Sequence, residues 1–415
     1  MFVIGSIPKP LKIFFGNLSP FFEKRQWPHF YSLVLVYALA HGRRNVAHMN
    51  LFLEDRTQRQ RHQDFLVKSP WVGASVVQAA ARFILESMKP QKGERLEILL
   101  DGSHAAKRGK KMEAAHRYFD PVTKSYQFGH AFVLCTLRFR GVVIPWAVRL
   151  WVPKGFCRSE RGKELGLKFK TSNQLAAEIL AEIPAEMAGL FTIRVLFDSG
   201  FLNEEVVGAC KKRGFHFLSV AKSNRVLFPF GYAGKRKVSS YGPGVIRTHG
   251  KTIHVDGERG RAKFRVAVRD GFMRGIGPVL AVFSQRLSDG SFITLVTDEM
   301  DLGARDAVIG YKARWAIEVL TKNLKQCLGL GQYQTRRYEG LIHHLHLSLI
   351  SFQALITLGI ESSAEKLPSG AAIESVPRLQ DLLRLVVAKD HMTRLRRRKN
   401  PLRILSRLKD LLACA

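Results

Sequence analysis

Apolar and polar residues alternate differently in successive parts of the chain. Residues 1 to about 90 show helical patterns, clearest in VVQAAARFILESM (76–88). The pattern then changes to short continuous apolar runs, LEILL (96–100) and FTIRVLF (191–197), which are typical of buried strands. AFVLCTLRF and VVIPWAVRLW flank Arg140-Gly141 and predict a hairpin. Strands thus follow a helical N-terminal region.

The second half of the chain continues with mixed elements. YKARWAIEVLTKNLK (311–325) predicts a helix, and HLHLSLISFQALITLGI (344–360) predicts a buried helix. Residues 223–275 are rich in glycine and basic residues. Further strands are predicted at FHFLSVA, PVLAVFS and FITLVTD. The mixture favours an α/β fold.

The helix predicted at 311–325 carries charged residues beside its apolar face. Its core-facing arc consists of Ala313, Ile317, Leu320, Leu324 and Leu328. The rim of that arc consists of Tyr311, Arg314, Glu318, Lys322 and Lys325. Half-buried charges need partners. Two interpretations stay open: Glu318 pairs locally with basic residues four positions away, or it shares a site with carboxylates elsewhere in the chain.

Two aspartates follow the buried apolar runs. LEILL is followed by Asp101 and Gly-Ser, so the strand is expected to end there, and FTIRVLF is followed by Asp198 and Ser-Gly. Each aspartate alone is typical of a turn after a strand. On neighbouring strands, however, two carboxylates would repel each other unless a cation lay between them. Divalent cations such as Mg²⁺ prefer oxygen ligands, and Glu318 would complete such a set.

The charge balance indicates a polyanionic partner. The chain of 415 residues has a formal net charge of +32 and a pI near 10.3, and its basic residues are spread along the whole length. A globular protein of this kind most often binds nucleic acid through the phosphates. A membrane surface is the second choice, but no polybasic segment adjoins a lipid-anchor motif, so no membrane partner is expected.

The cysteines and the first residues of the chain indicate the cellular compartment of the protein. Five cysteines lie far apart, and no pair has the spacing of a zinc or redox site. This pattern fits structural thiols in a reducing cytoplasm. The opening stretch MFVIGSIPKPLKIFF lacks the order of a signal peptide, and FYSLVLVYALAH (30–41) is too short to span a bilayer. We therefore expect a cytoplasmic protein.

One spacing resembles a family signature. Tyr311, Arg314, Glu318 and Lys325 form the pattern Y-x2-R-x3-E-x6-K, which resembles the YREK signature of cut-and-paste DDE transposases from bacterial insertion sequences. Three other stretches are similar to the same group: DGSHAAKRGKK, DSGF and RWAIEVLTKNLKQCLGLGQYQTRRYEGLIHHLHLSL. The resemblance covers roughly residues 95–358, and more weakly HQDFLVKSPW before them.

The resemblance implies an α/β fold with an RNase H-like core, a mixed five-stranded sheet flanked by helices. Asp101 and Asp198 would lie on adjacent strands and Glu318 on a later helix. The implied segments are a helical N-terminal DNA-binding region (1–92), the first part of the core (93–198), a β-rich insertion with core elements (199–305), the last part of the core with the Glu helix (306–360) and a basic helical C-terminal region (361–415).

The resemblance also implies a function. A DDE transposase binds terminal inverted repeats, cleaves DNA phosphodiester bonds with divalent metal and transfers the 3′ ends to target DNA. Asp101, Asp198 and Glu318 would be the catalytic residues and the ligands of two Mg²⁺ (or Mn²⁺) ions. The partners would be double-stranded DNA and, in a homodimeric complex at the bacterial nucleoid, a second copy of the chain. The residues expected to bind DNA are Tyr311, Arg314, Lys322, Lys325, Lys107, Arg108, Lys110 and Lys111.

Two other functions stay open. One is a non-catalytic DNA-binding protein derived from a transposase, against which all three acids argue. The other is a structure-selective nuclease of RNase H-like fold, which the complete signature disfavours. Relatives that form a DNA hairpin use a tryptophan in the insertion to hold a flipped base. Residues 199–310 have no tryptophan, and Tyr232, Tyr241 or Phe230 would have to replace it.

Several remaining residues have both a structural and a functional interpretation. His343, His344 and His346 could bind a metal, but they lack cysteine or carboxylate companions, so a position on a helix near the DNA is favoured. His104 is expected in a solvated loop, and Trp315 is expected to pack. The basic stretches that could contact phosphate or be ordinary surface are KSNR (222–225), KRK (235–237) and the tail RLRRRKN (394–400), which follows a linker at 361–377.

Overall fold

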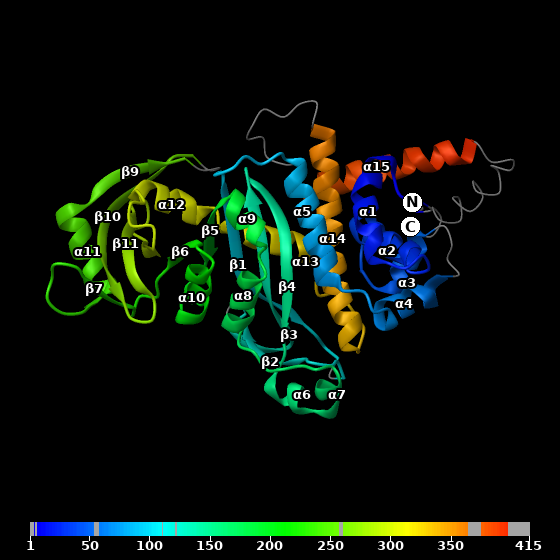
Figure 1. Ribbon diagram of the computed structural model, residues 1–415, viewed down its shortest axis with the longest axis horizontal. Helices are drawn as coiled ribbons and strands as arrows, with labels where there is room; N and C mark the ends of the chain where they lie inside the picture. The colour runs from blue at the N-terminus through cyan, green and yellow to red at the C-terminus, as the bar shows by residue number, and fades with distance from the viewer. Residues whose placement is uncertain are drawn as a thin grey trace.

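The structure, a computed structural model, arranges the chain along one extended sheet (Figure 1). It describes residues 4, 6–53, 58–109, 111–120, 123–256, 260–363 and 375–396. Lys110, the end of the basic tail and most of the expected linker lie outside the described residues. In Figure 1 a β-rich portion lies at one end, a core sheet in the middle and the N-terminal helices at the other end.

Six strands form the core part of the sheet. They are β1 (Arg95–Ala106), β2 (His116–Asp120), β3 (Ser125–Phe139), β4 (Val142–Trp151), β5 (Thr192–Phe197) and β6 (His216–Val220). β3 pairs antiparallel with β4, β1 and β2, whereas β5 pairs parallel with both β1 and β6. The order β4–β3–β1–β5–β6 is a mixed sheet flanked by helices. The predicted RNase H-like α/β fold class is confirmed.

The core strands follow from their sequence. Residues 96–100 of β1 and 193–197 of β5 are buried, because each strand has neighbours on both sides and helices over the sheet. The hairpin predicted between β3 and β4 is confirmed. Arg140 and Gly141 at its tip have φ angles of 48° and 84°. Positive φ at both positions is typical of a type I′ turn, whose twist matches that of the flanking strands.

The portion after β6 extends the same sheet. Its strands are β7 (Val226–Pro229), β8 (Arg236–Lys237), β9 (Lys251–Val255), β10 (Ala262–Met273), β11 (Gly277–Arg286) and β12 (Phe292–Thr297), with helix α11 (Val238–His249). β12 pairs antiparallel with β6, so the sheet continues without a break through β11 and β10. Among the described residues, twelve strands form this one sheet.

The N-terminal helices pack around one buried helix. They are α1 (Lys12–Leu18), α2 (Trp27–Leu39), α3 (Val46–Met49), α4 (Arg59–Lys68) and α5 (Gly73–Ser87); the buried helix is α14 (Tyr338–Ser363), and α15 (Val376–Arg396) packs beside it. Residues 338–361 are long and apolar enough to cross a bilayer, but nearly all of their most apolar part is buried in the protein. The prediction of a buried core helix at 344–360 is confirmed.

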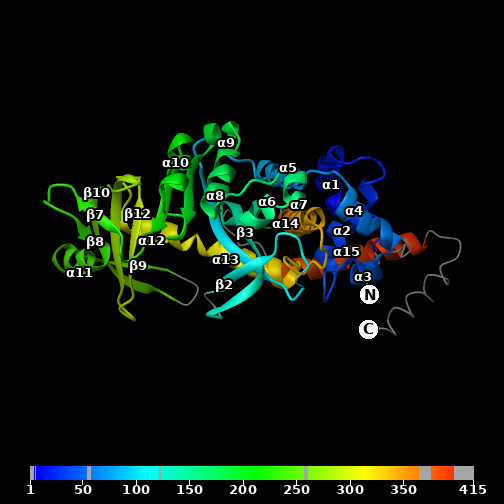
Figure 2. The same cartoon turned by 90° about the horizontal axis from the view of Figure 1, so that it is seen from below.

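The remaining helices lie against the core sheet. They are α6 (Lys154–Arg158), α7 (Glu160–Glu164), α8 (Ser172–Ala181), α9 (Ala185–Leu190), α10 (Glu204–Lys212), α12 (Ala304–Lys312) and α13 (Trp315–Cys327). Figure 2 shows α8, α9 and α10 on one side of the sheet and α13 crossing the other side. α13 contacts β1, and α12 contacts β6 and β10. The helix that carries Glu318 therefore lies over the strand that carries Asp101.

Candidate active site

Asp101 lies within β1 rather than at its end. The prediction that the strand ends there is wrong, because β3 continues to pair with β1 as far as Ala106 and Gly129. The parallel partner β5 stops earlier, and its last pair with β1 joins Leu99 and Leu196. Asp101 therefore lies just beyond the point where β5 leaves the edge of β1 open.

Asp198 is the first residue after β5. Continuing the register by two residues places it beside Asp101, and neighbouring strands lie about 4.8 Å apart. The Gly200 N–H donates to Asp198 Oδ1 at 2.8 Å, and the Ser219 hydroxyl donates to the Asp198 carbonyl oxygen at 3.2 Å. A Cβ atom at Gly200 would lie 3.1 Å from that Oδ1. Glycine thus permits the tight turn that holds this carboxylate at the end of the strand.

The helix predicted at 311–325 is in fact two helices. α12 ends at Lys312 and α13 begins at Trp315. Between them the N–H of Arg314 donates to the carbonyl oxygen of Tyr311, three residues earlier, at 3.1 Å. Such a bond tightens the backbone into a 3₁₀-type turn. Tyr311 therefore lies in the last turn of α12 and Glu318 in the first turn of α13.

Arg314 and Glu318 form an ion pair at the start of α13. An Nη2 N–H of Arg314 donates to Glu318 Oε1, and the two side chains are 14% and 30% exposed. The guanidinium carbon lies 5.7 Å from the centre of the Tyr311 ring. Arg314 Nε is buried and has no hydrogen-bond partner among the described residues. The local pairing that the sequence left open is present, and one guanidinium donor remains unused.

The three carboxylates influence one another electrostatically. Burial raises the pKa of Asp101 to about 6; Arg314 lowers this pKa, and the negative charges of Asp198 and Glu318 raise it. Burial also raises the pKa of Tyr311 to about 12, with Arg314 opposing and Asp198 and Glu318 adding to the rise. Tyr311 and Arg314 thus lie in the same charged environment as the three acids.

The two lysines of α13 are placed differently. Lys325 is half-buried, and its burial lowers its pKa, whereas the carboxylates of Asp101 and Asp120 raise it. Lys322 is exposed. Asp120, at the end of β2, was not predicted from the sequence. Its place in the sequence gave no sign that it would approach Lys325.

The basic run after Asp101 lies away from the carboxylates. Lys107 is half-buried, and Arg108 and Lys111 are exposed. Six residues of extended strand separate Asp101 from Lys107, which corresponds to about 20 Å. These side chains would meet DNA at a distance from any reacting phosphate.

The donor chemistry of the site fits a hard divalent cation. All three candidate ligands, Asp101, Asp198 and Glu318, are carboxylates, and oxygen is the ligand that Mg²⁺ prefers. Burial and neighbouring negative charge both disfavour ionisation of Asp101, and a cation would relieve this. In the part of the chain that the structure describes, no three His, Cys, Asp or Glu side chains are grouped so as to hold a metal ion. Glu318 would have to leave Arg314 to join the other two acids.

The three clustered histidines of α14 are buried in the core of the protein. His343 has its ring nitrogens 2.7 Å and 3.0 Å from the carbonyl oxygens of Leu66 and Trp71. His344 Nε2 donates to the Gly329 carbonyl at 2.9 Å, and burial lowers the pKa of this imidazole to about 3. His346 is buried as well. These side chains lie on a helix as expected, and they contact backbone carbonyls inside the protein.

Two other interpretations of single residues are wrong. His104 is half-buried on β1 and stacks on Tyr118 with ring centres 4.3 Å apart, so it is not in a solvated loop. Trp315 was expected to pack, but it is 63% exposed. It lies on the exposed face of α13, opposite the buried face that carries Ile317 and Leu320.

The aromatic residues proposed to replace a tryptophan differ in accessibility. Phe230 and Tyr232 are 47% and 55% exposed after β7, and the Arg269 guanidinium lies 5.9 Å from the Tyr232 ring centre. Tyr241 instead packs edge-on against Phe283 in the interior of the extension. Only the first two could meet a DNA base without rearrangement.

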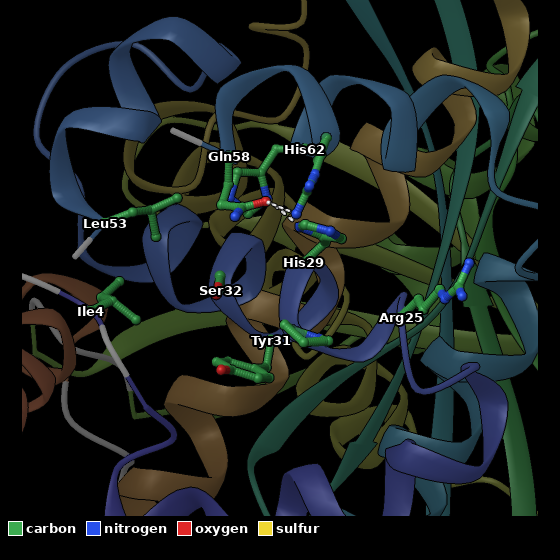
Figure 3. A pocket seen from close by; sticks show the side chains of 10 residues that line it. Ile4, Arg25, His29, Tyr31, Ser32, Leu53, Gln58 and His62 are labelled. Atoms are coloured by element: carbon green, nitrogen blue, oxygen red, sulfur yellow. Dashed lines mark hydrogen bonds between the residues drawn. The ribbon is translucent and has the colours of Figure 1, made fainter. Parts of the chain in front are cut away.

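A cavity of about 890 Å³ lies among the N-terminal helices (Figure 3). His29 and His62 meet there with their Nδ1 atoms 3.3 Å apart, and Arg25 and Arg61 also line the cavity. None of the lining residues comes from β1, β5 or α13. The cavity is therefore separate from the carboxylates.

A comparison with models of protein families identifies the family of the chain. The model of the DDE superfamily endonucleases matches residues 17–274, which is more than half of the chain. The chain belongs to the DDE superfamily of endonucleases. None of the curated proteins compared with it matches.

Membership of the DDE superfamily supports a DDE transposase and gives the protein a nuclease- or transposase-like function on DNA. Enzymes of this kind generally depend on a divalent metal. The matched part of this DDE superfamily endonuclease includes Asp101 and Asp198 and ends before Tyr311 and Glu318. The signature on α12 and α13 therefore depends on the sequence and the geometry alone.

Proposed function

We propose that this DDE superfamily endonuclease is the transposase of a bacterial insertion sequence and belongs to the YREK-signature group. It binds the terminal inverted repeats, cleaves phosphodiester bonds at the element boundary and transfers the 3′ ends to target DNA. The observation that carries the proposal is the convergence of Asp101, Asp198 and Glu318 from β1, the end of β5 and α13, beside Tyr311 and Arg314.

The three carboxylates would hold two Mg²⁺ or Mn²⁺ ions. When bound, the ions would lower the pKa of a water molecule and stabilise charge on the leaving oxygen. In the hydrolytic step the water oxygen bonds to phosphorus, the bond to the 3′ oxygen breaks, and a 3′ hydroxyl and a 5′ phosphate result. That 3′ hydroxyl then attacks a phosphodiester of the target and releases a target 3′ hydroxyl.

Arg314 would change partners during this sequence. A guanidinium presents several donors in a planar fork that matches a phosphate. Its Nε is buried and unused among the described residues, while an Nη2 N–H is bonded to Glu318. A DNA phosphate that bound the guanidinium would release Glu318 toward the cations, so that Glu318 would join cations already held by Asp101 and Asp198 only when DNA is present. Tyr311 would contact the same phosphate, and Lys325 the neighbouring end DNA.

The regions around the carboxylates would bind DNA and assemble the protein–DNA complex. A formal net charge of +32 supports extensive phosphate contact. We assign recognition of the transposon ends to the helical region 1–92, further DNA or subunit contacts to 361–415, and base contacts to the portion 199–305. The working complex would be a homodimer on two ends, in the cytoplasm at the nucleoid.

A non-catalytic DNA-binding protein is the second candidate. The ion pair between Arg314 and Glu318 favours it, because a permanent pair would keep Glu318 from a metal. This candidate predicts specific binding of end DNA without cleavage under any metal condition.

The test is cleavage of an end-labelled duplex that carries the gene's own flanking DNA. Wild type and Glu318→Gln are compared with Mg²⁺, with Mn²⁺ and with EDTA. Glu186→Gln, an exposed glutamate on α9, is the matched control. We expect boundary cuts by wild type and the control that require metal, and binding without cuts by Glu318→Gln.

Other outcomes would decide against the proposal. Boundary binding without cuts by wild type would favour the non-catalytic protein. Cuts at branched DNA regardless of sequence would indicate a structure-selective nuclease. Full activity of Glu318→Gln would remove Glu318 from the site.

A further inference from the structure

A basic pocket lies at the far end of β1, away from the carboxylates. It has a volume of about 410 Å³ and is formed by residues that are distant in the sequence, 106–109 with 111–112 on one side and 332–334 with Arg336 on the other. Its charged lining consists of Lys107, Arg108, Lys111 and Arg336. Two glutamines, Gln332 and Gln334, add neutral donors and acceptors.

Lys107 joins the two walls of the pocket. Its Nζ donates to the carbonyl oxygen of Tyr333 at 2.9 Å and to that of Gly331, and it lies 3.4 Å from the centre of the Tyr333 ring. The burial that accompanies these contacts lowers the pKa of Lys107 to about 8. Because its donors are largely committed to protein carbonyls, Lys107 acts as a structural link and not as an open ligand.

Glu113 holds the second wall in place through hydrogen bonds, and nearby arginines neutralise its carboxylate charge. Its backbone N–H donates to the Arg336 carbonyl at 3.0 Å, and its Oε2 accepts the N–H of Tyr338 at 2.7 Å. Its Oε1 lies 3.2 Å from Arg161 Nε and 3.7 Å from Arg337 Nη1. The acidic group closest in sequence to the pocket is thus occupied by its own partners.

The other cations of the pocket have no such partners. Arg108, Lys111 and Arg336 are exposed, and none of them forms an ion pair with another described residue. Three uncompensated cations around one concavity repel one another, and an anion would relieve that repulsion. The volume exceeds what a single phosphate fills and suits a short stretch of sugar-phosphate backbone.

We propose that this pocket is a binding site for backbone phosphates of the DNA, with Arg108 and Arg336 as the phosphate ligands and Lys107 as the positioning residue that holds the pocket together. The proposal rests on the proposed function, because it assumes a DNA substrate. Six residues of extended strand put Lys107 about 20 Å from Asp101.

The pocket also connects the strand that carries Asp101 with the segment that follows the helix of Glu318. Segment 332–336 follows α13, which carries Glu318, and Lys107 follows the strand that carries Asp101. A phosphate held between Arg108 and Arg336 would therefore bridge the strand of one acid and the helix of another. The contact of Lys107 with Tyr333 would support the same connection.

The test uses the salt dependence of duplex binding by the full chain. Removing one arginine that binds a phosphate should reduce the slope of log Kobs against log salt by about 0.9. We expect Arg108→Gln and Arg336→Gln to reduce the slope by about 0.9 each, and the double variant by about twice that. Arg140→Gln, at an exposed arginine of the β3–β4 hairpin at the opposite end of β3 from the pocket, is the matched control and should leave the slope unchanged.

Lys107→Met separates positioning from binding. It keeps most of the unbranched side chain and removes its ammonium group, and with it the hydrogen bonds to the carbonyl oxygens of Gly331 and Tyr333. We expect the slope to fall by as much as in the Arg108, Arg336 double variant, and we expect the arginine substitutions to add little in the Lys107→Met background. A circular dichroism melt shows whether this variant is folded. If it is unfolded, the salt slopes of the Arg108→Gln and Arg336→Gln variants decide the outcome.

The outcomes separate this pocket from the proposed function. If wild type binds no duplex, both fail. If wild type binds and cleaves its flanking DNA but Arg108→Gln and Arg336→Gln keep the wild-type slope, the pocket proposal alone is overturned. A reduced slope in the control as well would show a general charge effect and would also overturn it.

Discussion

Removing the charge of Asp101 should stabilise the metal-free protein at neutral pH. In the folded protein the pKa of this carboxyl rises from its ordinary value of 3.8 to about 6, first through burial and then through the charges of Asp198 and Glu318. The folded state therefore holds the proton of Asp101 more tightly than the unfolded chain does. Stability is lost as the pH rises from about 4 through about 6, because Asp101 ionises against an unfavourable environment.

The magnitude follows from the two pKa values. Each factor of ten in proton affinity corresponds to about 1.4 kcal/mol, so the rise to about 6 sets an upper bound of about 3 kcal/mol. Asp101 is only half-buried, and solvent screening reduces the effect. We expect Asp101→Asn to be more stable than wild type by about 1–3 kcal/mol at pH 7.5 and to be close to wild type at pH 4.

The assay is urea unfolding followed by circular dichroism at several pH values, with EDTA and with Mg²⁺. A cation bound by the carboxylates stabilises the folded protein by mass action, by about 2.7 kcal/mol at 100 times its dissociation constant. Mg²⁺ should therefore stabilise wild type at pH 7.5, have little effect at pH 4, and have little effect on Asp101→Asn at either pH. Asp301→Asn, at an exposed aspartate, is the control.

Two results would refute this reasoning. If Asp101→Asn destabilised the metal-free protein at pH 7.5, Asp101 would be well solvated or paired as an anion. If Mg²⁺ stabilised wild type and Asp101→Asn equally, the cation would bind elsewhere.

Four further substitutions test stability, and their effects are measured as shifts in the urea midpoint. Glu299→Ala leaves Arg194, which is 4% exposed, without its carboxylate and should cost about 3–5 kcal/mol. Glu94→Ala breaks an ion pair with an arginine side chain that is 40% exposed and should cost much less than Glu299→Ala, so equal costs would contradict the contrast. Tyr37→Phe removes a hydroxyl that bonds a buried histidine of α14 and should cost about 1–3 kcal/mol; a neutral result would show that the bond is not formed. Trp315→Ala should cost less than about 1 kcal/mol because the ring is 63% exposed, and a cost near 3 kcal/mol would place it in the core.

The part of the fold that could be predicted is the part that local pattern determines. The apolar runs before Asp101 and Asp198 indicate strands buried on both faces, and they form β1 and β5. Arg140-Gly141 indicates the hairpin because few residue pairs tolerate positive φ at both positions. Helical periodicity likewise identifies the buried face of α13, where Ile317 is fully covered.

What could not be predicted depends on partners distant in the sequence. β1 continues past Asp101 because β3 pairs with it, although Gly102 and Ser103 favour a turn. The kink between α12 and α13 contains no glycine or proline that would mark it. The histidines of α14 give no local sign that they bond carbonyls of remote segments, as His344 does with Gly329. The second wall of the basic pocket is likewise brought to β1 only by the tertiary fold.

The measurement that tests the central claim most directly is manganese anomalous scattering from crystals of the protein bound to its flanking DNA. We predict manganese held by Asp101, Asp198 and Glu318, with the Arg314 guanidinium on a DNA phosphate instead of on Glu318. Manganese held without Glu318, or DNA bound with Arg314 and Glu318 still paired and no manganese at the three acids, would contradict the account.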